Sequence, residues 1–377
     1  MKMPVFGVER WMDTYETGVR YNLGETCVDS ITLGELLELS GKKEEILSKL
    51  LDLRLSYGHI TGNPDLKEQV ASLYEKQGRE NVLIMNGGSA ANFLALYTLA
   101  EPGKRVVACV PSYQQHYSIP EALGAEVSLL WLREEQGFLP DMEELRRLAD
   151  PGVDLICLCN PNNPTGSLMQ EPLLKEIVAL AEEKGAWLFC DEVYRGLLHQ
   201  EGARVPSVAD LYQKGISTGS MSKVYSLAGI RTGWIVASPE FLKACELVRD
   251  YTTISCAQMD EILAALALAN RKALLERNLP VVRRGAAVLD AWVAREPRVR
   301  YVKPQAGTTA FLHFGYSLNS ETFCKELLEK HGVLLVPGSC FGMEHWYRMG
   351  YAYSPEALEE GLEHVSLFFR DLENRGL

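Results

Sequence analysis

The first candidate for chemistry in this sequence is a lysine with small neighbours. Lys223 follows Ser220 and a strand-like run, and the segment after it leads to Arg231. Small neighbours leave room for an aldehyde coenzyme, and an amine held in its neutral form can attack that aldehyde to give a Schiff base. Ser220 and Arg231 can both bind a phosphate, the arginine through its planar fork. Alone, the segment is equally compatible with a surface lysine in a strand-to-helix loop.

A carboxylate directly follows another apolar, strand-like run. Asp191 comes at the end of this run, where ligands collect in open parallel sheets. Paired with a pyridine nitrogen, such a carboxylate keeps the nitrogen protonated and makes the ring an electron sink. Tyr194 could donate a hydrogen bond to a hydroxyl of the same ring. The alternative is that Asp191 caps the helix that comes next.

Two further connections between strands and helices carry polar groups. In the loop 160–166, two X-Pro bonds and a glycine build a rigid turn in which Asn163 can present its amide to a ligand oxygen. Gly88 and Ser89 open a helix-like stretch, and backbone N–H groups exposed at a helix N-terminus cradle a phosphate. The glycine spacing matches no nucleotide-binding motif, so a nucleotide is not implied. Each segment alone could also be a plain turn.

These segments belong to a chain in which strands and helices alternate. Periodicity predicts strands over 82–85, 105–110, 126–130, 155–159, 187–190, 215–219 and 233–236, and helices over 90–100, 118–123, 142–148, 172–184 and 239–254. That alternation predicts a three-layer α/β/α fold with a mostly parallel sheet.

Beyond this region the pattern predicts a second, smaller α+β domain. Its expected elements are a long amphipathic helix, short strands and a terminal helix, over 271–295, 299–302, 309–313, 320–331, 333–337 and 355–374. The N-terminal residues cannot form a core alone, so we expect them to join it. We therefore predict a large domain over 46–274 and a small discontinuous domain over 1–45 and 275–377.

Composition excludes several classes of protein. The formal net charge of -12 argues against nucleic acid as a partner. We see no signal peptide and no uncharged apolar run of the ~20 residues that span a bilayer, so we expect no membrane association and a cytoplasmic location. The nine cysteines are scattered, as expected for reduced core residues. Cys157 and Cys159 lack further ligands nearby, so no metal is expected.

In this order, the segments resemble the fold-type I pyridoxal-5'-phosphate enzymes, specifically the class I/II aminotransferase family. The resemblance covers nearly the whole chain, and its most specific parts are Asn163-Pro164-Thr165-Gly166, Asp191-Glu192-Val193-Tyr194, and Ser222-Lys223 followed by Arg231. It implies that pyridoxal 5'-phosphate is the cofactor and that Lys223 is its Schiff-base lysine.

The resemblance also implies roles for further residues. Tyr113 would stack on the cofactor ring, while Gly88 and Ser89 would hold its phosphate through backbone amides. Tyr57 would reach the phosphate across a subunit interface, so a homodimer is implied. Arg348 would grip the substrate α-carboxylate, because bidentate geometry fixes the Cα–H bond relative to the ring. The alternative for Arg348 is a surface salt bridge.

Two segments depart from the family pattern. Tyr225-Ser226 stands where an aromatic residue followed by glycine is usual, and the segment 22–25 only loosely resembles the loop that faces the substrate. Both bear on substrate choice. No second arginine can be assigned to a side-chain carboxylate, so a dicarboxylic substrate is not supported.

The expected function is that of an aminotransferase, which exchanges an amino group between an α-amino acid and a 2-oxo acid. Lys223 would remove the α-proton while Asp191 lets the ring hold the electron pair. The same residues would serve a β-lyase, a racemase, or an oxidase or cyclase, so these remain alternatives. A cofactor-bound regulatory module is the non-enzymatic alternative. The intact Lys223, Asp191 and Arg348 count against it, as does the lack of a DNA-binding extension.

Overall fold

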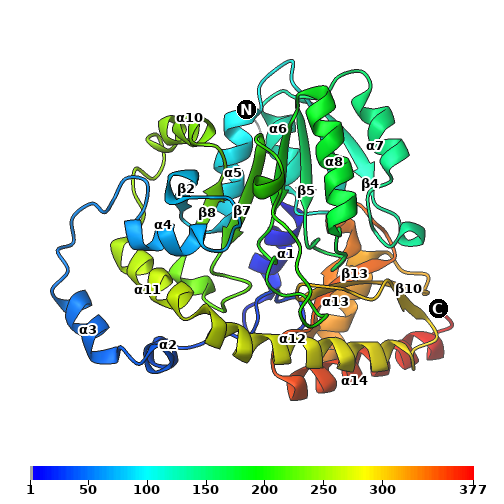
Figure 1. The fold of residues 1–377 in the computed structure, drawn as a ribbon. Helices are drawn as coiled ribbons and strands as arrows, with labels where there is room; N and C mark the ends of the chain where they lie inside the picture. Colours follow the sequence, from blue (N-terminus) through cyan, green and yellow to red (C-terminus); the bar gives the residue numbers. More distant parts are fainter. Residues whose placement is uncertain (1–2) are drawn as a thin grey trace.

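A seven-stranded sheet forms the centre of the structure, a computed structural model that describes residues 3–377 (Figure 1). The strand order is β2-β8-β7-β6-β5-β3-β4. Neighbours from β7 to β4 run parallel, and only β8 runs antiparallel to both of its neighbours. The strands are β2 (Val82–Met85), β3 (Arg105–Val110), β4 (Glu126–Trp131), β5 (Leu155–Cys159), β6 (Trp187–Asp191), β7 (Gly215–Ser220) and β8 (Gly233–Val236). The predicted α/β fold with a mostly parallel sheet is confirmed.

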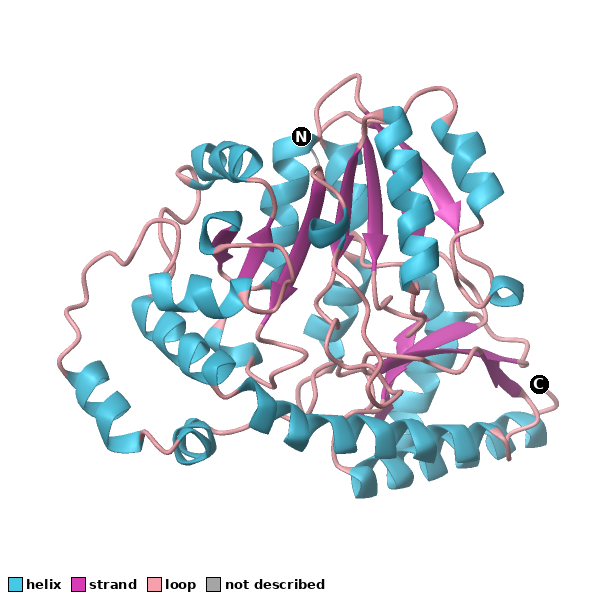
Figure 2. Cartoon of the chain, viewed as in Figure 1, coloured by secondary structure: helices cyan, strands magenta, loops and turns pink. Residues whose placement is uncertain are grey.

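Helices cover both faces of this sheet (Figure 2). Successive side chains of a strand point to opposite faces, and in β6 Leu188 joins one core while Phe189 joins the other. The core that contains Phe189 is closed by α5 (Gly88–Leu99), α6 (Gln115–Ala122) and α10 (Pro239–Arg249). The core that contains Leu188 is closed by α7 (Met142–Ala149), α8 (Glu171–Lys184) and α9 (Val208–Leu211).

A smaller antiparallel sheet comes after the large one in the chain. Its order is β12-β13-β10-β9, from β9 (Val299–Tyr301), β10 (Thr309–Phe314), β12 (Val336–Pro337) and β13 (Trp346–Gly350). Its core includes a stack of Phe314 on Phe323, with ring centroids 4.0 Å apart. Phe323 belongs to α13 (Ser320–His331), and the terminal α14 (Pro355–Asn374) packs beside both α13 and α12 (Arg271–Val293) (Figure 1).

The N-terminal segment touches both parts of the molecule. The helix α1 (Gly7–Tyr15) packs against β12, and β1 (Tyr21–Asn22) pairs in parallel with β11 (Val333–Leu334). Further along, α2 (Leu33–Ser40) lies against α11 (Gln258–Ala269), and α3 (Lys43–Leu51) projects away from both sheets at the lower left of Figure 1. The chain returns through an extended loop to α4 (Pro64–Ala71), which packs on α11.

Two predicted elements differ from the structure for identifiable reasons. The helix predicted over 239–254 ends at Arg249, whose guanidinium turns inward and donates to the carbonyls of Ile60 and Ile84. The backbone turns directly after this helix, and Ile254 has a φ of 63°. The strand predicted over 333–337 is two strands, because β11 pairs with β1 while β12 pairs with β13.

Several elements were not predicted, among them α11 and β13. The sequence of α11 after Glu261 is almost wholly apolar and shows little helical periodicity, and most of that stretch is buried. Of the helices in the part of the chain that the structure describes, none is long and apolar enough to cross a membrane.

Candidate active site

A cavity of about 300 Å³ opens at the carboxyl ends of the parallel strands. Cys159, Asp191 and Ser220 end β5, β6 and β7 there, Arg348 reaches it from β13, and α1 covers it from the N-terminal segment. Every predicted site residue except Tyr57 lines this cavity: Gly88, Ser89, Tyr113, Asn163, Asp191, Tyr194, Ser220, Lys223, Arg231 and Arg348. Tyr57 is 77% exposed and lies outside the cavity of its own chain.

Asp191 is buried and oriented by three contacts. Its Oδ2 accepts a hydrogen bond from Asn92 Nδ2 at 2.7 Å and lies 3.3 Å from His116 Nε2, and its Oδ1 accepts from the backbone N–H of Val193 at 3.1 Å. The other ring nitrogen of His116 lies 2.9 Å from Ser112 Oγ. Asp191 is thus a rigidly held carboxylate inside the cavity. The bond from Val193 closes a local turn, and no helix follows Asp191 before α9, so the helix cap considered as an alternative is absent.

Sequence reasoning missed both Asn92 and His116. Asn92 lies one helical turn after Gly88 on α5, so its i, i+4 spacing from that predicted site residue was a usable signal. His116 carried no signal, since a lone histidine near the start of a helix is ordinary in any sequence. Only the fold brings the side chain of His116, from α6, against Asp191 at the end of β6.

The amine of Lys223 is held by the N-terminal segment. Its Nζ donates to Thr26 Oγ1 at 2.7 Å and to Cys27 Sγ at 3.3 Å. Burial acts to lower the pKa of Lys223, but Cys27, which accepts a hydrogen bond from the amine, and the carboxylate of Glu25 outweigh it and raise the pKa above its usual range. The protein groups by themselves therefore favour the ammonium form, contrary to the neutral amine expected from the sequence.

The N-terminus of α5 and Arg231 form one end of the cavity. Gly87 caps α5 with no side-chain acceptor, so the first N–H groups of the helix stay available to an anion. A Cβ on Gly87 would lie 2.6 Å from Arg231 Nη2, and one on Gly88 would lie 3.1 Å from a methyl group of Val193. The two glycines thus allow the guanidinium and the helix terminus to approach one another. This end fits a phosphate group.

Arg348 carries an unmatched positive charge into the cavity. The side chain is only 3% exposed, and it donates from Nη2 to the carbonyl of Gly24 at 3.0 Å and from Nη1 to Asn163 Oδ1 at 3.4 Å. Among the described residues no carboxylate pairs with it, and its buried Nε has no partner. The surface salt bridge considered as an alternative is therefore absent. A buried cation of this kind is stabilised by an anionic ligand that accepts its free donors.

Two tyrosines complete the walls of the cavity. Tyr113 donates its hydroxyl to Glu9 Oε1 at 2.8 Å and packs edge-on against Phe6. Tyr194 is buried, and burial raises its pKa although Lys223 and Arg348 act to lower it. Tyr194 therefore remains a neutral phenol that can donate a hydrogen bond at physiological pH.

Comparisons with known proteins assign this arrangement to a family. The family model described as aminotransferase class I and II matches residues 38–365. The chain belongs to this family. Enzymes of the family depend on pyridoxal phosphate, so the chain is a pyridoxal-phosphate-dependent enzyme of the aminotransferase family.

Three similar proteins differ in the reactions that their names state. A pyridoxal-phosphate-dependent aminotransferase from Streptococcus suis is 43% identical, with a TM-score of 0.95 over 99% of each chain. The cyclase OrfR, also pyridoxal-phosphate-dependent, is 27% identical, with a TM-score of 0.91 over 98% of each chain. Capreomycidine synthase from Streptomyces vinaceus is 30% identical over 97% of this chain and 93% of its own length.

The cavity of this aminotransferase-family chain fits the cofactor in its donor set. The uncapped helix terminus with Arg231 suits the phosphate, Asp191 suits the ring nitrogen, and Lys223 suits the aldehyde. The described residues contain no group of three or more His, Cys, Asp or Glu that could hold a metal ion.

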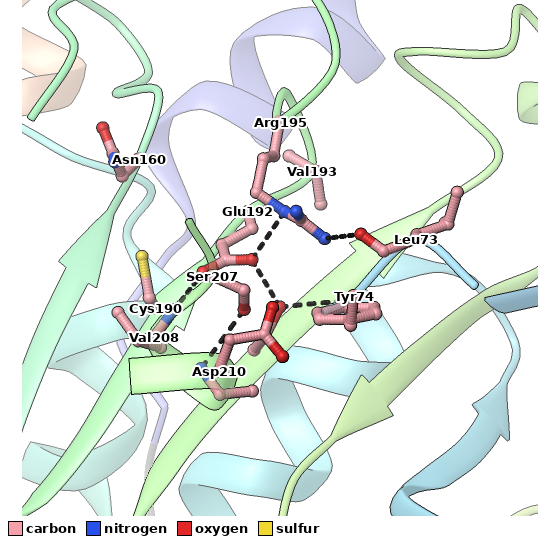
Figure 3. A network of polar contacts seen from close by, with 12 residues as sticks. Leu73, Tyr74, Asn160, Cys190, Glu192, Val193, Arg195, Ser207, Val208 and Asp210 are labelled. Atoms are coloured by element: carbon pink, nitrogen blue, oxygen red, sulfur yellow. Dashed lines mark hydrogen bonds and ion pairs between the residues drawn. The ribbon is translucent and has the colours of Figure 1, made fainter. Parts of the chain in front are cut away.

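In this member of the family a buried polar network supports the turn that carries Asp191 and Tyr194 (Figure 3). Glu192 points away from the cavity and accepts from Val208 N at 2.9 Å and Ser217 Oγ at 2.7 Å. It also pairs with Arg195 Nε at 2.9 Å. Since Glu192 lies between the two cavity residues, these contacts fix the backbone on which both are carried.

Proposed function

We propose that this protein is an aminotransferase that exchanges an amino group between an α-amino acid and a 2-oxo acid. One observation carries the proposal: the cavity holds a lysine amine, a fixed carboxylate and a buried arginine that has no acidic partner among the described residues. A zwitterionic amino acid supplies the anion that Arg348 lacks. Its amino group would then lie toward the coenzyme at Lys223.

The bound coenzyme would supply an electron sink for the pair released from the substrate Cα–H bond. Lys223 would take the α-proton on Nζ and return it one step later, so the amine acts as base and then as acid. Arg348 and Asn163 would orient the substrate carboxylate and hence the Cα–H bond. Asp191 would hold a proton on the ring nitrogen, and Tyr194 would donate to the ring hydroxyl.

The remaining predicted residues would bind rather than react. We assign the phosphate to the backbone of Gly88 and Ser89 with the side chains of Ser220 and Arg231. Tyr113 would lie against the coenzyme ring. The two parts of the chain, residues 46–274 and residues 1–45 with 275–377, would form the large and small domains that close on this cavity.

A homodimer with Tyr57 in the partner's cavity is part of the proposal. Tyr57 and Leu55 belong to the loop between α3 and α4, and Leu51 ends α3; all three are more than three-quarters exposed. Tyr251, which is 92% exposed, lies just after α10. We take these side chains to belong to one surface, because large apolar patches mark places that another protein covers. A second copy of this chain would cover them and place Tyr57 beside the phosphate.

Cyclisation is the second candidate function, because one of the similar proteins, OrfR, is named a cyclase. It matches this chain over nearly its full length. A cyclase and an aminotransferase need the same lysine, carboxylate and arginine, and they differ in the fate of the substrate once the α-proton has been removed. The two therefore give different products from the same site.

Spectra of the purified holoprotein test both candidates. Each amino acid of a panel is added without a 2-oxo acid, and the coenzyme spectrum and the products are recorded. Transfer converts the coenzyme to its aminated form and releases one equivalent of 2-oxo acid, whereas cyclisation leaves the coenzyme unchanged over many turnovers. A protein with no visible coenzyme band, or a Lys223→Ala variant that keeps that band, would overturn the proposal.

Lys223→Arg is the matched control for the charge of the lysine. It keeps a cation in the cavity but cannot form the Schiff base or move the α-proton at neutral pH, because an arginine does not lose its proton in proteins. We expect it to bind the coenzyme without the band of the lysine-bound form. Transfer activity in this variant would contradict the role given to Lys223.

A further inference from the structure

The helix α1 turns an acidic face toward the cavity. Glu9, Met12 and Glu16 line the cavity, and their spacing places them on one side of a helix. The orientation is fixed, because Trp11 on another side is buried and donates from Nε1 to the carbonyl of Leu335 at 2.8 Å. Figure 1 shows α1, in dark blue, at the end of the large sheet toward which its parallel strands point.

A third carboxylate reaches the same cavity from the loop after β1. Glu25 Oε1 accepts from the backbone N–H groups of Thr26 at 2.6 Å and Cys27 at 2.8 Å. Burial acts to raise the pKa of Glu25, but Lys223 and these N–H groups outweigh it and lower the pKa below its usual value. Glu25 is therefore anionic at neutral pH, next to the Gly24 carbonyl that accepts from Arg348.

The cavity contains three cations, and the proposed function uses all of them. Lys223 and Arg231 serve the coenzyme, and Arg348 serves the substrate carboxylate. Glu9, Glu16 and Glu25 form no ion pair with any described residue, although they line the same cavity. Once coenzyme and carboxylate are bound, no cation among the described cavity residues is left to balance the negative charge of these three side chains.

The unpartnered Arg348 independently points to a ligand in this space. The Arg348 side chain is 3% exposed and lines the cavity without an acidic partner among the described residues, so its free N–H donors can receive an anionic group there. A substrate carboxylate on Arg348 places the rest of the amino acid between the strand ends and α1. The side chain of the substrate would then meet the carboxylates.

From this arrangement we infer that the amino donor carries a cationic side chain, a guanidinium or an ammonium, received by Glu9, Glu16 and Glu25. The inference rests on the proposed function and names its substrate class. Glu9 is pre-oriented by the hydroxyl of Tyr113 at 2.8 Å, and Glu25 by two backbone N–H groups, so neither must be ordered when the cation binds. An acidic side chain would be repelled by the same three groups.

Pairs of donors that differ only in charge test the inference on the holoprotein. Arginine is compared with citrulline and lysine with norleucine, and the rate of coenzyme conversion gives kcat/KM for each. For at least one pair, we expect kcat/KM of the cationic donor to be about tenfold higher than that of its neutral partner at low salt. This ratio should fall as salt screens the exposed Glu9 and Glu16. Neutral partners that react as well as both cations would overturn the inference while leaving the proposed function intact.

A variant on the acidic face assigns the preference to these carboxylates. Glu16→Gln should lower the cation-to-neutral ratio about threefold, because an exposed ion pair contributes modestly. Asp13→Asn is the matched control, since Asp13 is an exposed acid of the same helix that does not line the cavity. An equal fall of the ratio in Glu16→Gln and Asp13→Asn would contradict the assignment. Glu25→Gln is measured in the same way, and an unchanged ratio in both Glu16→Gln and Glu25→Gln would contradict it as well.

Binding of unreactive acids separates this inference from the proposed function. Both 5-guanidinopentanoate and pentanoate offer a carboxylate to Arg348 but no amino group, and each is titrated against the coenzyme band. The guanidino acid should bind about tenfold more tightly. If no amino acid converts the coenzyme, the proposed function fails. If the two acids bind equally tightly, the inference that the cavity recognises a cationic side chain fails, whatever the outcome for the proposed function.

Discussion

The amine of Lys223 donates a hydrogen bond to the hydroxyl of Thr26 at 2.7 Å, although 197 positions separate the two residues in the chain. Thr26 is itself fixed, because its carbonyl accepts from Thr308 Oγ1 at 2.6 Å. The contact ties the lysine just beyond β7 to the N-terminal segment and to the loop before β10. The position of the proposed base thus depends on three distant parts of the sequence.

Thr26→Val should slow proton transfer by Lys223. Valine keeps the shape of threonine but removes the acceptor of the ammonium, so the pKa of Lys223 should fall. We expect kcat to drop about tenfold, as for the loss of one hydrogen bond to a charged group. The pH profile of kcat should move with it, and Thr26→Ser should restore both. An unchanged pH profile would show that Thr26 is only structural.

Arg348→Lys should weaken substrate binding although the positive charge is kept. Lysine lacks the planar fork, so the carboxylate loses bidentate contact and the Cα–H bond is less well aligned. We expect kcat/KM to fall roughly 10- to 100-fold, the effect of one or two charge-assisted hydrogen bonds. Coenzyme absorbance should stay as in the parent protein. A larger loss of coenzyme than of substrate affinity would contradict the assignment.

Asn92→Leu should loosen the coenzyme rather than unfold the protein. The amide of Asn92 donates to Asp191 at 2.7 Å and accepts from Thr218 Oγ1 at 2.6 Å, so its loss removes the closest neutral donor to the carboxylate. The dissociation constant of the coenzyme, measured by dialysis against the free cofactor, should rise about tenfold. Asn92→Gln serves as a comparison, because it keeps the amide on a side chain that is one methylene longer. Unchanged coenzyme affinity in both variants would leave Asn92 without this role.

Arg195→Met should destabilise the fold more than Glu192→Gln does. Removing the arginine leaves Glu192 buried with its charge uncompensated, whereas glutamine keeps hydrogen bonds to Ser217 without a charge (Figure 3). We expect a loss of about 3 kcal/mol in the free energy of unfolding for Arg195→Met. Urea unfolding of both variants and the double variant measures the coupling. Equal losses from the two single variants would contradict an ionised Glu192.

Glu261 should make stability fall as the pH rises through neutrality. Burial raises the pKa of this carboxyl to about 7, although Asn63 N–H and Arg249 act to lower it. A folded pKa above the unfolded one means that stability is fully present below the unfolded value of 4.5 and is lost as the pH rises through about 7. In Glu261→Gln, the free energy of unfolding should no longer fall in this way between pH 5 and pH 8. A parent protein more stable at pH 8 than at pH 5, with the same slope in the variant, would sink the assignment.

Local sequence patterns were sufficient for the large sheet and for the residues at its strand ends. A buried strand is apolar over its whole length and is followed by a polar turn, so Asp191 and Ser220 could be placed at the ends of β6 and β7 from neighbours alone. Gly88 at the start of α5 obeys the same logic. These signals span fewer than about ten residues, the range over which propensity acts.

Residues whose place depends on packing between distant segments could not be found in this way. His116 and Asn92 meet Asp191 only because α5 and α6 lie on the same face of the sheet. Arg249 ends α10 early because it bonds to the carbonyls of Ile60 and Ile84, which no local pattern shows.

By itself the amino-acid sequence determined which reactive groups are present: a lysine, a carboxylate, a glycine-opened helix terminus and an arginine, in a chain that forms a mostly parallel sheet. Only the tertiary structure decided what surrounds them. Thr26 reaches the lysine, and Arg348 is buried with no acid beside it in the described part of the chain. Glu9, Glu16 and Glu25 share one cavity. The physical reason is that strand and helix formation depends on near neighbours, whereas charge balance in a cavity depends on groups that meet only when the chain has packed.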